Sequence, residues 1–234
     1  MEWWDQAIVL RHRRHGEHDA IVTTLTQEHG RHLGLVKGGF GSKRRASIEP
    51  GQEVRLHWHA RLSEQLGRFD LETQRNLSAA YMDDAKRLAA VLSAFALLDV
   101  ALPERENHSD LFFDLRNLLE HLSLDNWRVL YVRWEARLLA SLGYGLNLES
   151  CAVTGETENL VYVSPRSGRA VSRDGAGPYR DRLLLLPSFL LNDDSGETSE
   201  DIKNGLRLTG HFLERHVLIH QNMPEERRHL ERII

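Results

Sequence analysis

The first eighty residues carry short runs in which apolar and polar positions alternate, and turns rich in glycine separate these runs. Alternation with a period of two predicts β-strands that are buried on one face. A β-unit this small protects its strand edges best by closing into a barrel, and the five-stranded oligonucleotide-binding (OB) barrel is the common form that binds nucleic acid. The predicted strands are Gln6–Leu10, Ala20–Thr26, His32–Lys37, Glu53–Trp58 and Leu66–Glu72.

After residue 82 the apolar period becomes helical. One predicted helix follows Asp83 and Asp84, either of which is a suitable N-cap, and a second begins at Ser109. A third begins at Asp125 or Asn126 and carries an apolar stripe as far as a glycine at position 143, which is expected to supply a left-handed stop. Three amphipathic helices of this kind need one another to bury their apolar faces, so a helical bundle is predicted.

A last long helix is predicted from about Ile202 to about Gln221, behind an acidic loop from Asn192 to Ser199. The fold class is therefore α+β, an OB barrel followed by a helical domain with an insert. The expected ranges are 1–80 for the OB barrel, 81–147 for the first part of the helical domain, 148–180 for the insert and 181–234 for the C-terminal part of the helical domain.

The insert has the spacing of a four-cysteine zinc ribbon in which only Cys151 is still a cysteine. The other three ligand positions hold Thr154, Ser172 and Gly175, which cannot form a tetrahedral thiolate site. We therefore expect a module that folds without metal, with no cofactor elsewhere. Residues 160–163 are expected to pair with residues 169–172 as a β-hairpin.

Charge is distributed unevenly along the chain. Acidic residues outnumber basic ones 34 to 30, yet residues 29 to 48 contain five bases and no acid. Clustered cations favour polyanions because binding releases condensed counterions. The glycine-rich centre of this segment predicts a mobile loop, in which Phe40 has little opportunity for burial and is suited to stacking on bases. A solvated surface turn is the alternative interpretation.

The candidate DNA-binding residues follow from this segment and from a basic strip on the first strand. Lys37, Lys43, Arg44 and Arg45 are expected to contact phosphates, with Arg31 in the same acid-free segment. The complete predicted set is Arg11, Arg13, Arg14, Arg31, Lys37, Phe40, Lys43, Arg44 and Arg45.

Other chemistries have weak support. The chain has no nucleophile elbow, phosphate-binding loop or paired-carboxylate motif, so no catalytic residue is assigned and an enzyme is not expected. Among thirteen histidines the pairs His57/His59 and His216/His220 are best spaced for a metal, but surface histidines are the favoured interpretation. The single cysteine, the lack of a long apolar run and the acidic N-terminus favour a cytoplasmic protein that does not contact membranes.

Several segments together resemble the RecO family of bacterial DNA repair proteins. They are the stretch from Arg133 to Gly145 (RWEARLLASLGYG), Cys151 to Gly155 (CAVTG), Val161 to Pro165 (VYVSP), Val36 to Gly39 (VKGG) with Ser42 to Arg44 (SKR), and Ser109 to Phe113 (SDLFF). The resemblance covers nearly the whole chain in order. It implies an OB barrel, a helical domain and a zinc-ribbon-like insert, although family members with all four cysteines bind zinc and this chain keeps only one.

The resemblance also implies function and partners. It implies a non-enzymatic recombination mediator, cytoplasmic and associated with the nucleoid, which binds single- and double-stranded DNA and anneals complementary strands. RecR is an implied partner, as is the acidic C-terminal tail of single-strand binding protein, and RecA is an indirect one because the mediator helps to load it. The helical domain is where the family docks that tail, so Arg133 is expected to bind it, with Phe113 and Leu118 forming a pocket for its phenyl ring.

Two rival functions also fit the sequence. One is a protein-interaction scaffold whose barrel binds a peptide rather than DNA. The other is a metal-dependent nuclease that uses His57 and His59.

Overall fold

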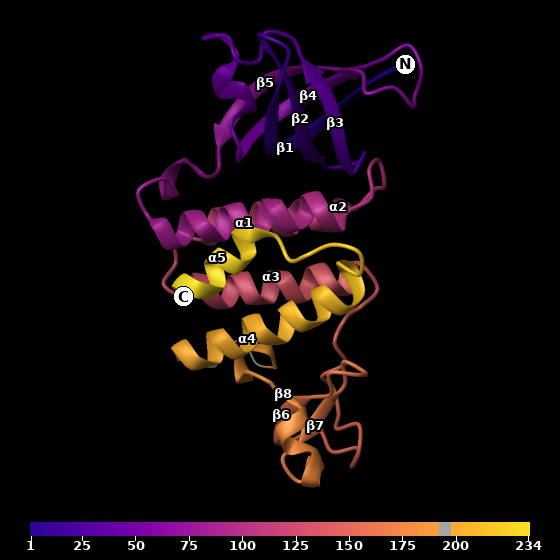
Figure 1. The fold of residues 1–234 in the computed structure, drawn as a ribbon, viewed down its shortest axis with the longest axis vertical. Helices are drawn as coiled ribbons and strands as arrows, with labels where there is room; N and C mark the ends of the chain where they lie inside the picture. The colour runs from indigo at the N-terminus through magenta and orange to yellow at the C-terminus, as the bar shows by residue number, and fades with distance from the viewer. Residues whose placement is uncertain (192–197) are drawn as a thin grey trace. The chain divides into compact units, whose positions relative to one another are not determined.

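The computed structural model describes residues 1–191 and 198–234, and within them the chain is an α+β protein (Figure 1). Its N-terminal strands form a closed sheet in the order β1-β2-β3-β5-β4, which confirms the predicted five-stranded arrangement. All neighbours in the sheet are antiparallel except β3 and β5, which are parallel. The strands are β1 (Glu2–His15), β2 (Asp19–Thr26), β3 (Arg31–Val36), β4 (Gln52–His59) and β5 (Arg68–Asn76).

The barrel closes around one apolar core because inward positions alternate with outward ones. Trp58 and Phe69, which face each other across β4 and β5, are 3% and 1% exposed. Gly34 on β3 is required beneath the Phe69 ring, since a Cβ at this position would lie only 2.5 Å from that ring. The first strand is far longer than the five residues predicted, and an irregularity between Val9 and Arg11 shifts its register against β2.

Two helices, α1 (Ala85–Ala101) and α2 (Ser109–His121), follow the barrel. The predicted N-cap is confirmed at Asp84, whose carboxylate accepts hydrogen bonds from the backbone N–H groups of the first turn. A buried carboxylate on β4, that of Glu53, forms ion pairs with Arg75 at 2.6 Å and with Arg116 on α2 at 3.2 Å. Short 3-10 turns cover Arg45–Ile48 (η1) and Ala79–Tyr81 (η2).

The chain divides into two compact units, residues 1–120 and 121–234. The first unit therefore contains α1 and α2 together with the barrel, whereas the sequence pattern suggested a division near residue 80. The four domain ranges expected from the sequence remain predictions.

The second unit combines helices with a three-stranded sheet of order β7-β6-β8. The predicted hairpin is confirmed, since β6 and β7 pair antiparallel. The expected left-handed stop after α3 is also confirmed, because Gly143 has a φ of 86°. The elements are α3 (Trp127–Ser141), β6 (Leu160–Val163), β7 (Ala170–Ser172), η3 (Gly177–Arg182), β8 (Leu184–Leu185), η4 (Ser188–Leu190), α4 (Ser199–Phe212), the π turn η5 (Leu213–Val217) and α5 (Glu225–Ile233).

The prediction of one last helix from about Ile202 to about Gln221 was wrong at its C-terminal end. Helix α4 ends at Phe212 and passes into the π turn, and a separate helix, α5, begins after Pro224. Proline fixes φ and lacks an N–H, so it suits the start of a helix better than its interior. Of the predicted acidic loop, residues 192–197 lie outside the described part of the chain. No helix in the described ranges is long and apolar enough to cross a membrane.

Candidate nucleic-acid interface

The glycine-rich loop, defined here as residues 37–44, leaves β3 and folds back on the β1–β2 turn. The N–H of Gly38 donates to the carboxylate of Asp19 at 2.8 Å, and the N–H of Phe40 donates to the carbonyl of His18 at 3.0 Å. Gly38 has a φ of 62°, a left-handed conformation that suits glycine. The backbone of the loop is thus hydrogen-bonded to the barrel at two positions.

Phe40 does not project from the loop as the sequence suggested. Its ring is half-buried and packs against the core of the barrel. The guanidinium of Arg14 lies over the ring, 4.5 Å from its centroid, and His12 meets the ring at a steep angle. The expectation of little burial was therefore wrong: glycine neighbours allowed the loop to turn the ring inward. Stacking on a base would require Arg14 to move from the ring face.

Most of the predicted cations lie on the surface. Arg13, Lys37 and Lys43 are exposed. Most of the others are also exposed and form surface ion pairs or a hydrogen bond to a backbone carbonyl. Solvent-exposed ion pairs of this kind contribute little to the free energy of folding. These guanidinium groups can therefore exchange their present partners for phosphates. The pairs are Arg11 with Asp99 at 3.2 Å, Arg44 with Asp70 at 3.8 Å and Arg45 with Glu49 at 3.6 Å, while Arg14 donates to the carbonyl of Glu17.

Arg31 differs from the other cations of the acid-free segment. Its side chain is only 16% exposed, its Nε donates to the carbonyl of Leu102 at 2.8 Å, and its Nη1 lies 3.2 Å from the carboxylate of Asp99. These contacts tie β3 to the end of α1. We therefore assign Arg31 a structural role in the first unit, and its predicted phosphate contact stays untested.

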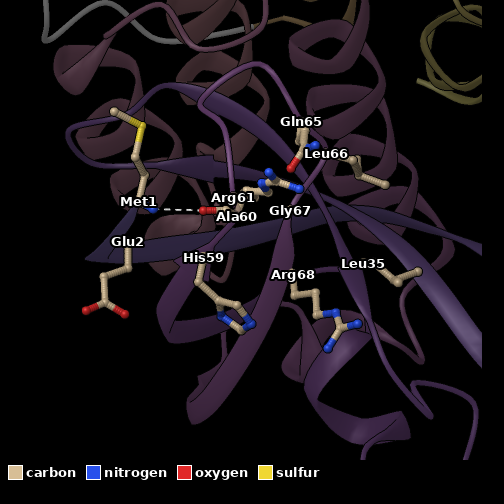
Figure 2. A pocket seen from close by; sticks show the side chains of 10 residues that line it. All are labelled: Met1, Glu2, Leu35, His59, Ala60, Arg61, Gln65, Leu66, Gly67 and Arg68. Atoms are coloured by element: carbon tan, nitrogen blue, oxygen red, sulfur yellow. Dashed lines mark hydrogen bonds between the residues drawn. The ribbon is translucent and has the colours of Figure 1, made fainter.

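Sequence reasoning missed an open hollow of about 890 Å³ at the end of the barrel, shown in Figure 2. Arg61 and Arg68 enter it from the β4–β5 connection and the start of β5, and both are exposed. The N-terminal amine donates to the carbonyl of Ala60 at 2.8 Å, the dashed line in Figure 2, which fixes the first residue beside the hollow. Among its lining side chains Glu2 is the one acid.

A second, smaller hollow of about 380 Å³ shares Met1 and Glu2 with the first. Its wall is aromatic: the Trp3 ring stacks on His29 with centroids 3.9 Å apart and on Trp58 at 5.5 Å. His32 also lines it and is only 3% exposed. Burial, helped by the charge of Arg105, lowers the pKa of His32 to about 4, so this imidazole is neutral at physiological pH. No sequence motif marks these rings, since their juxtaposition depends on barrel closure.

His57 and His59 lie on the outer face of the barrel, and each is only partly exposed, less than expected for surface histidines. Together with Asp70 they form a group whose ligand atoms all lie within 4.8 Å of one another. Among the described residues, this group of histidine and carboxylate side chains lies close enough together to hold a metal ion.

The segment predicted to form the insert packs around Cys151, and its zinc-ribbon-like character stays a prediction. The buried sulfur of Cys151 accepts hydrogen bonds from the backbone N–H groups of Val153, Thr154 and Ser172 and from the Ser172 hydroxyl, at 3.2 to 3.4 Å. A Cβ at Gly175 would lie 2.8 Å from this sulfur and 3.1 Å from the Ser172 hydroxyl, so these two side chains leave no room for a larger residue at the fourth ligand position. Burial raises the pKa of the thiol, but these hydrogen bonds outweigh it and lower the pKa to about 6.

The three predicted partner-binding residues have different environments. Phe113 on α2 is 49% exposed, whereas Leu118 on the same helix is 2% exposed and cannot reach a partner without repacking. Arg133 belongs to the second unit, where its Nε and Nη2 donate to the carbonyl of Phe189 at 3.0 and 2.7 Å. Phe113 and Leu118 belong to the first unit, so a joint role of the three residues stays a prediction.

Comparison with known proteins identifies the family. A family model described as "Recombination protein O N terminal" matches residues 1–74, and one described as "Recombination protein O C terminal" matches residues 82–223. The chain belongs to the RecO family. Curated proteins named "DNA repair protein RecO" include one from Rhodospirillum centenum, 51% identical over 97% of this chain and 92% of that protein. Another, from Rhodospirillum rubrum, is 44% identical over 100% of this chain and 96% of that protein. A third, from Cereibacter sphaeroides, is 44% identical over 100% of this chain and 98% of that protein.

RecO membership confirms the resemblance seen in the sequence and supports a role in DNA repair and recombination. It agrees with the α+β organisation, in which a five-stranded sheet precedes the helices.

Proposed function

We propose that this RecO-family protein is a recombination mediator, rather than an enzyme, that binds single- and double-stranded DNA and anneals complementary strands. The observation that supports this best is the exposed cation group of the barrel, Lys37, Lys43, Arg44 and Arg45, held at a hydrogen-bonded loop in a protein of net charge −4. A clustered positive surface on an otherwise acidic protein directs DNA to one place.

The barrel supplies the binding surface in this proposal. We assign it to the OB type because its five strands close in the order β1-β2-β3-β5-β4. Arg13 and Arg14 extend the cation group along β1, and the hollow with Arg61 and Arg68 offers a second electropositive region on the same barrel. The insert around Cys151 is a zinc-ribbon-like module that has lost its metal ligands.

The second unit docks partner proteins, which for this family we take to be RecR and the C-terminal tail of single-strand binding protein. The protein then helps RecA to load onto DNA coated with that binding protein, in the cytoplasm at the nucleoid. The exposed ring of Phe113 in the first unit is a further candidate contact for a partner.

The proposal is tested by fluorescence anisotropy of labelled single-stranded and duplex oligonucleotides over a range of salt concentrations, together with an annealing assay on complementary strands. A steep inverse dependence of affinity on salt and faster annealing are expected. Absence of binding at low salt would refute DNA binding and favour a scaffold that binds peptides. Strand cleavage stimulated by a metal ion would instead support a nuclease.

A further inference from the structure

Two histidines and a carboxylate meet on the outer face of β4 and β5. Residues two apart on a strand share a face, so His57 and His59 project together, while Trp58 between them is buried in the core. Asp70 is the cross-strand partner of His57, which brings its carboxylate to the same face. The position of all three side chains is thus fixed by the register of one antiparallel pair.

The distances are close to those that a metal ion requires. In a tetrahedral zinc site with bonds of about 2.0–2.1 Å, ligand atoms are separated by about 3.3 Å. The ligand atoms of His57, His59 and Asp70 lie within 4.8 Å of one another, so closing the site requires a movement of about 1.5 Å. Asp70 is 54% exposed at its side chain and can make this movement by rotation without disturbing the core.

Neighbouring rings already hold the two histidines of the group in place. The His57 side chain is 19% exposed, and its ring stacks on Trp4 with centroids 4.4 Å apart and planes 11° apart. The His57 and His59 rings are themselves 5.3 Å apart. The Nδ1 atom of His59 is buried and has no hydrogen-bond partner, at 3.9 Å from the Asp70 carboxylate. A buried ring nitrogen without a partner is a group that a bound cation would satisfy.

We propose that His57, His59 and Asp70 bind one divalent cation of the zinc class. Two imidazoles and one carboxylate suit a borderline cation better than Mg²⁺ or Ca²⁺, which prefer oxygen ligands alone. Three protein ligands leave a fourth position open. Asp70, whose side chain is 54% exposed, forms the side of the site nearest solvent. Glu2, whose carboxylate is 3.4 Å from the His57 ring, adds a negative charge that favours the cation.

The site is connected to the cation group of the glycine-rich loop. Arg44 lies 3.8 Å from the carboxylate of Asp70, the same group that would bind the metal. A cation on Asp70 therefore releases Arg44 for a phosphate, and a phosphate oxygen could take the open metal position. This coupling to DNA rests on the proposed function, whereas the cation site itself does not.

The test is a zinc titration of the full-length protein against a chromophoric chelator of known affinity. The Cys151→Ser variant is the background, so that the thiol cannot contribute a ligand. One zinc per chain is expected, with affinity reduced at least tenfold in His59→Gln and in Asp70→Asn, since loss of even an outer-shell partner costs 10- to 100-fold. His220→Gln with His229→Gln, two exposed histidines of the second unit, is the matched control and should bind zinc as the background does.

Equal zinc affinity in the background, His59→Gln and Asp70→Asn would overturn the proposal, as would failure of the folded background protein to compete with the chelator. Circular dichroism establishes that each variant is folded. Anisotropy with a single-stranded oligonucleotide, with and without saturating zinc, then separates the two proposals. Zinc binding without any DNA binding would support the metal site and refute the proposed function. DNA binding without zinc binding would support the proposed function and refute the metal site.

Discussion

Arg227 on α5 and Glu135 on α3 form an ion pair in which neither side chain has any exposed surface. Arg227 Nη2 lies 3.1 Å from Glu135 Oε2 and also donates to the carbonyl of Leu206 at 2.9 Å. The hydroxyl of Thr209 on α4 donates to the same carboxylate. Three helices of the second unit are thereby joined through one buried charge network. Because water cannot reach these charges, each is stabilised by its partner instead.

Removing one partner of this pair should be far more damaging than removing both. Glu135→Gln leaves the buried Arg227 guanidinium with only the half-exposed carboxylate of Glu231, 3.3 Å away, as a counter-charge. A loss near the lower end of about 3–5 kcal/mol in the free energy of unfolding is expected. The double variant Glu135→Leu with Arg227→Met should be more stable than Glu135→Gln alone, because neither buried charge remains. Urea unfolding followed by circular dichroism measures both. Single and double variants of equal stability would contradict the view of an obligatory pair.

Lys43 and Arg44 of the glycine-rich loop, together with Arg45 directly after it, should determine how DNA affinity depends on salt. Replacing Lys43, Arg44 and Arg45 with alanine should weaken binding to all sequences about equally. It should also reduce the salt slope for single-stranded DNA by up to about two units, since each lost phosphate contact removes about 0.7. The slope comes from anisotropy titrations at several salt concentrations.

The matched control for this variant is Arg166→Ala, Arg169→Ala and Arg173→Ala, which removes the same charge from exposed positions of the second unit. Its slope should stay close to that of the wild type. A triple loop variant with an unchanged slope would exclude the loop from the DNA interface.

Much of this fold could be predicted from local patterns. Alternation located all five barrel strands, and Asp84 and Gly143 marked helix ends because capping and left-handed stops depend only on a few neighbouring residues. The predicted last helix stopped at about Gln221, short of Pro224, so α5 was missed, and no proline or glycine directly follows the earlier end of α4 at Phe212 to mark it.

The contacts that could not be predicted join residues far apart in sequence. Sequence rules place arginine on the surface, yet Arg227 is fully buried. Its buried partner Glu135 lies 92 residues away in the sequence, so no local pattern reveals the pair. Arg31 was counted with the DNA-binding cations since nothing local reveals Asp99 beside it. For the same reason Asp70 was not grouped with His57 and His59, although the two histidines were singled out: their shared site exists only once β4 and β5 are in register.

The thiol of Cys151 should make stability depend on pH in a defined window. Its pKa falls from an ordinary value near 9 to about 6 in the folded protein. A lowered pKa means that the unfolded chain binds more protons between these values, so the thiolate stabilises the fold fully above pH 9 and this contribution disappears as the pH falls through 6. The Tm difference between wild type and Cys151→Ser should therefore grow from pH 6 to pH 9.

Differential scanning calorimetry measures this difference, and the ultraviolet absorbance of the thiolate gives the titration directly. With the barrel histidine removed by His59→Gln in both proteins, a chelator should leave the Tm of both unchanged if the insert folds without metal. A difference that is constant across the window would show that Cys151 remains protonated in the folded state.

Arg133 is the residue through which the second unit should recognise an acidic peptide that ends in phenylalanine, the tail expected on single-strand binding protein. Its guanidinium already donates twice to the carbonyl of Phe189, which holds it at a fixed position on α3. A terminal carboxylate would gain a charge-assisted contact from such a pre-oriented cation. Arg133→Glu should weaken binding of a labelled tail peptide by at least about 1.5 kcal/mol, the scale of losing one charged hydrogen bond.

Because the same arginine also stabilises the Phe189 segment, the measurement must separate binding from folding. Arg207→Gln removes one exposed cation from α4 in the same unit and serves as the matched control, with tail affinity expected to equal that of the wild type. Thermal unfolding of Arg133→Glu shows whether the second unit remains folded at the temperature of the assay. If a folded Arg133→Glu variant binds the tail as tightly as the wild type, Arg133 acts only as a structural clamp on Phe189, and the peptide must be recognised elsewhere. If oligonucleotide affinity falls in parallel with tail affinity, the two ligands do not use separate surfaces, because a cation in the second unit should not contribute to phosphate contacts made by the barrel.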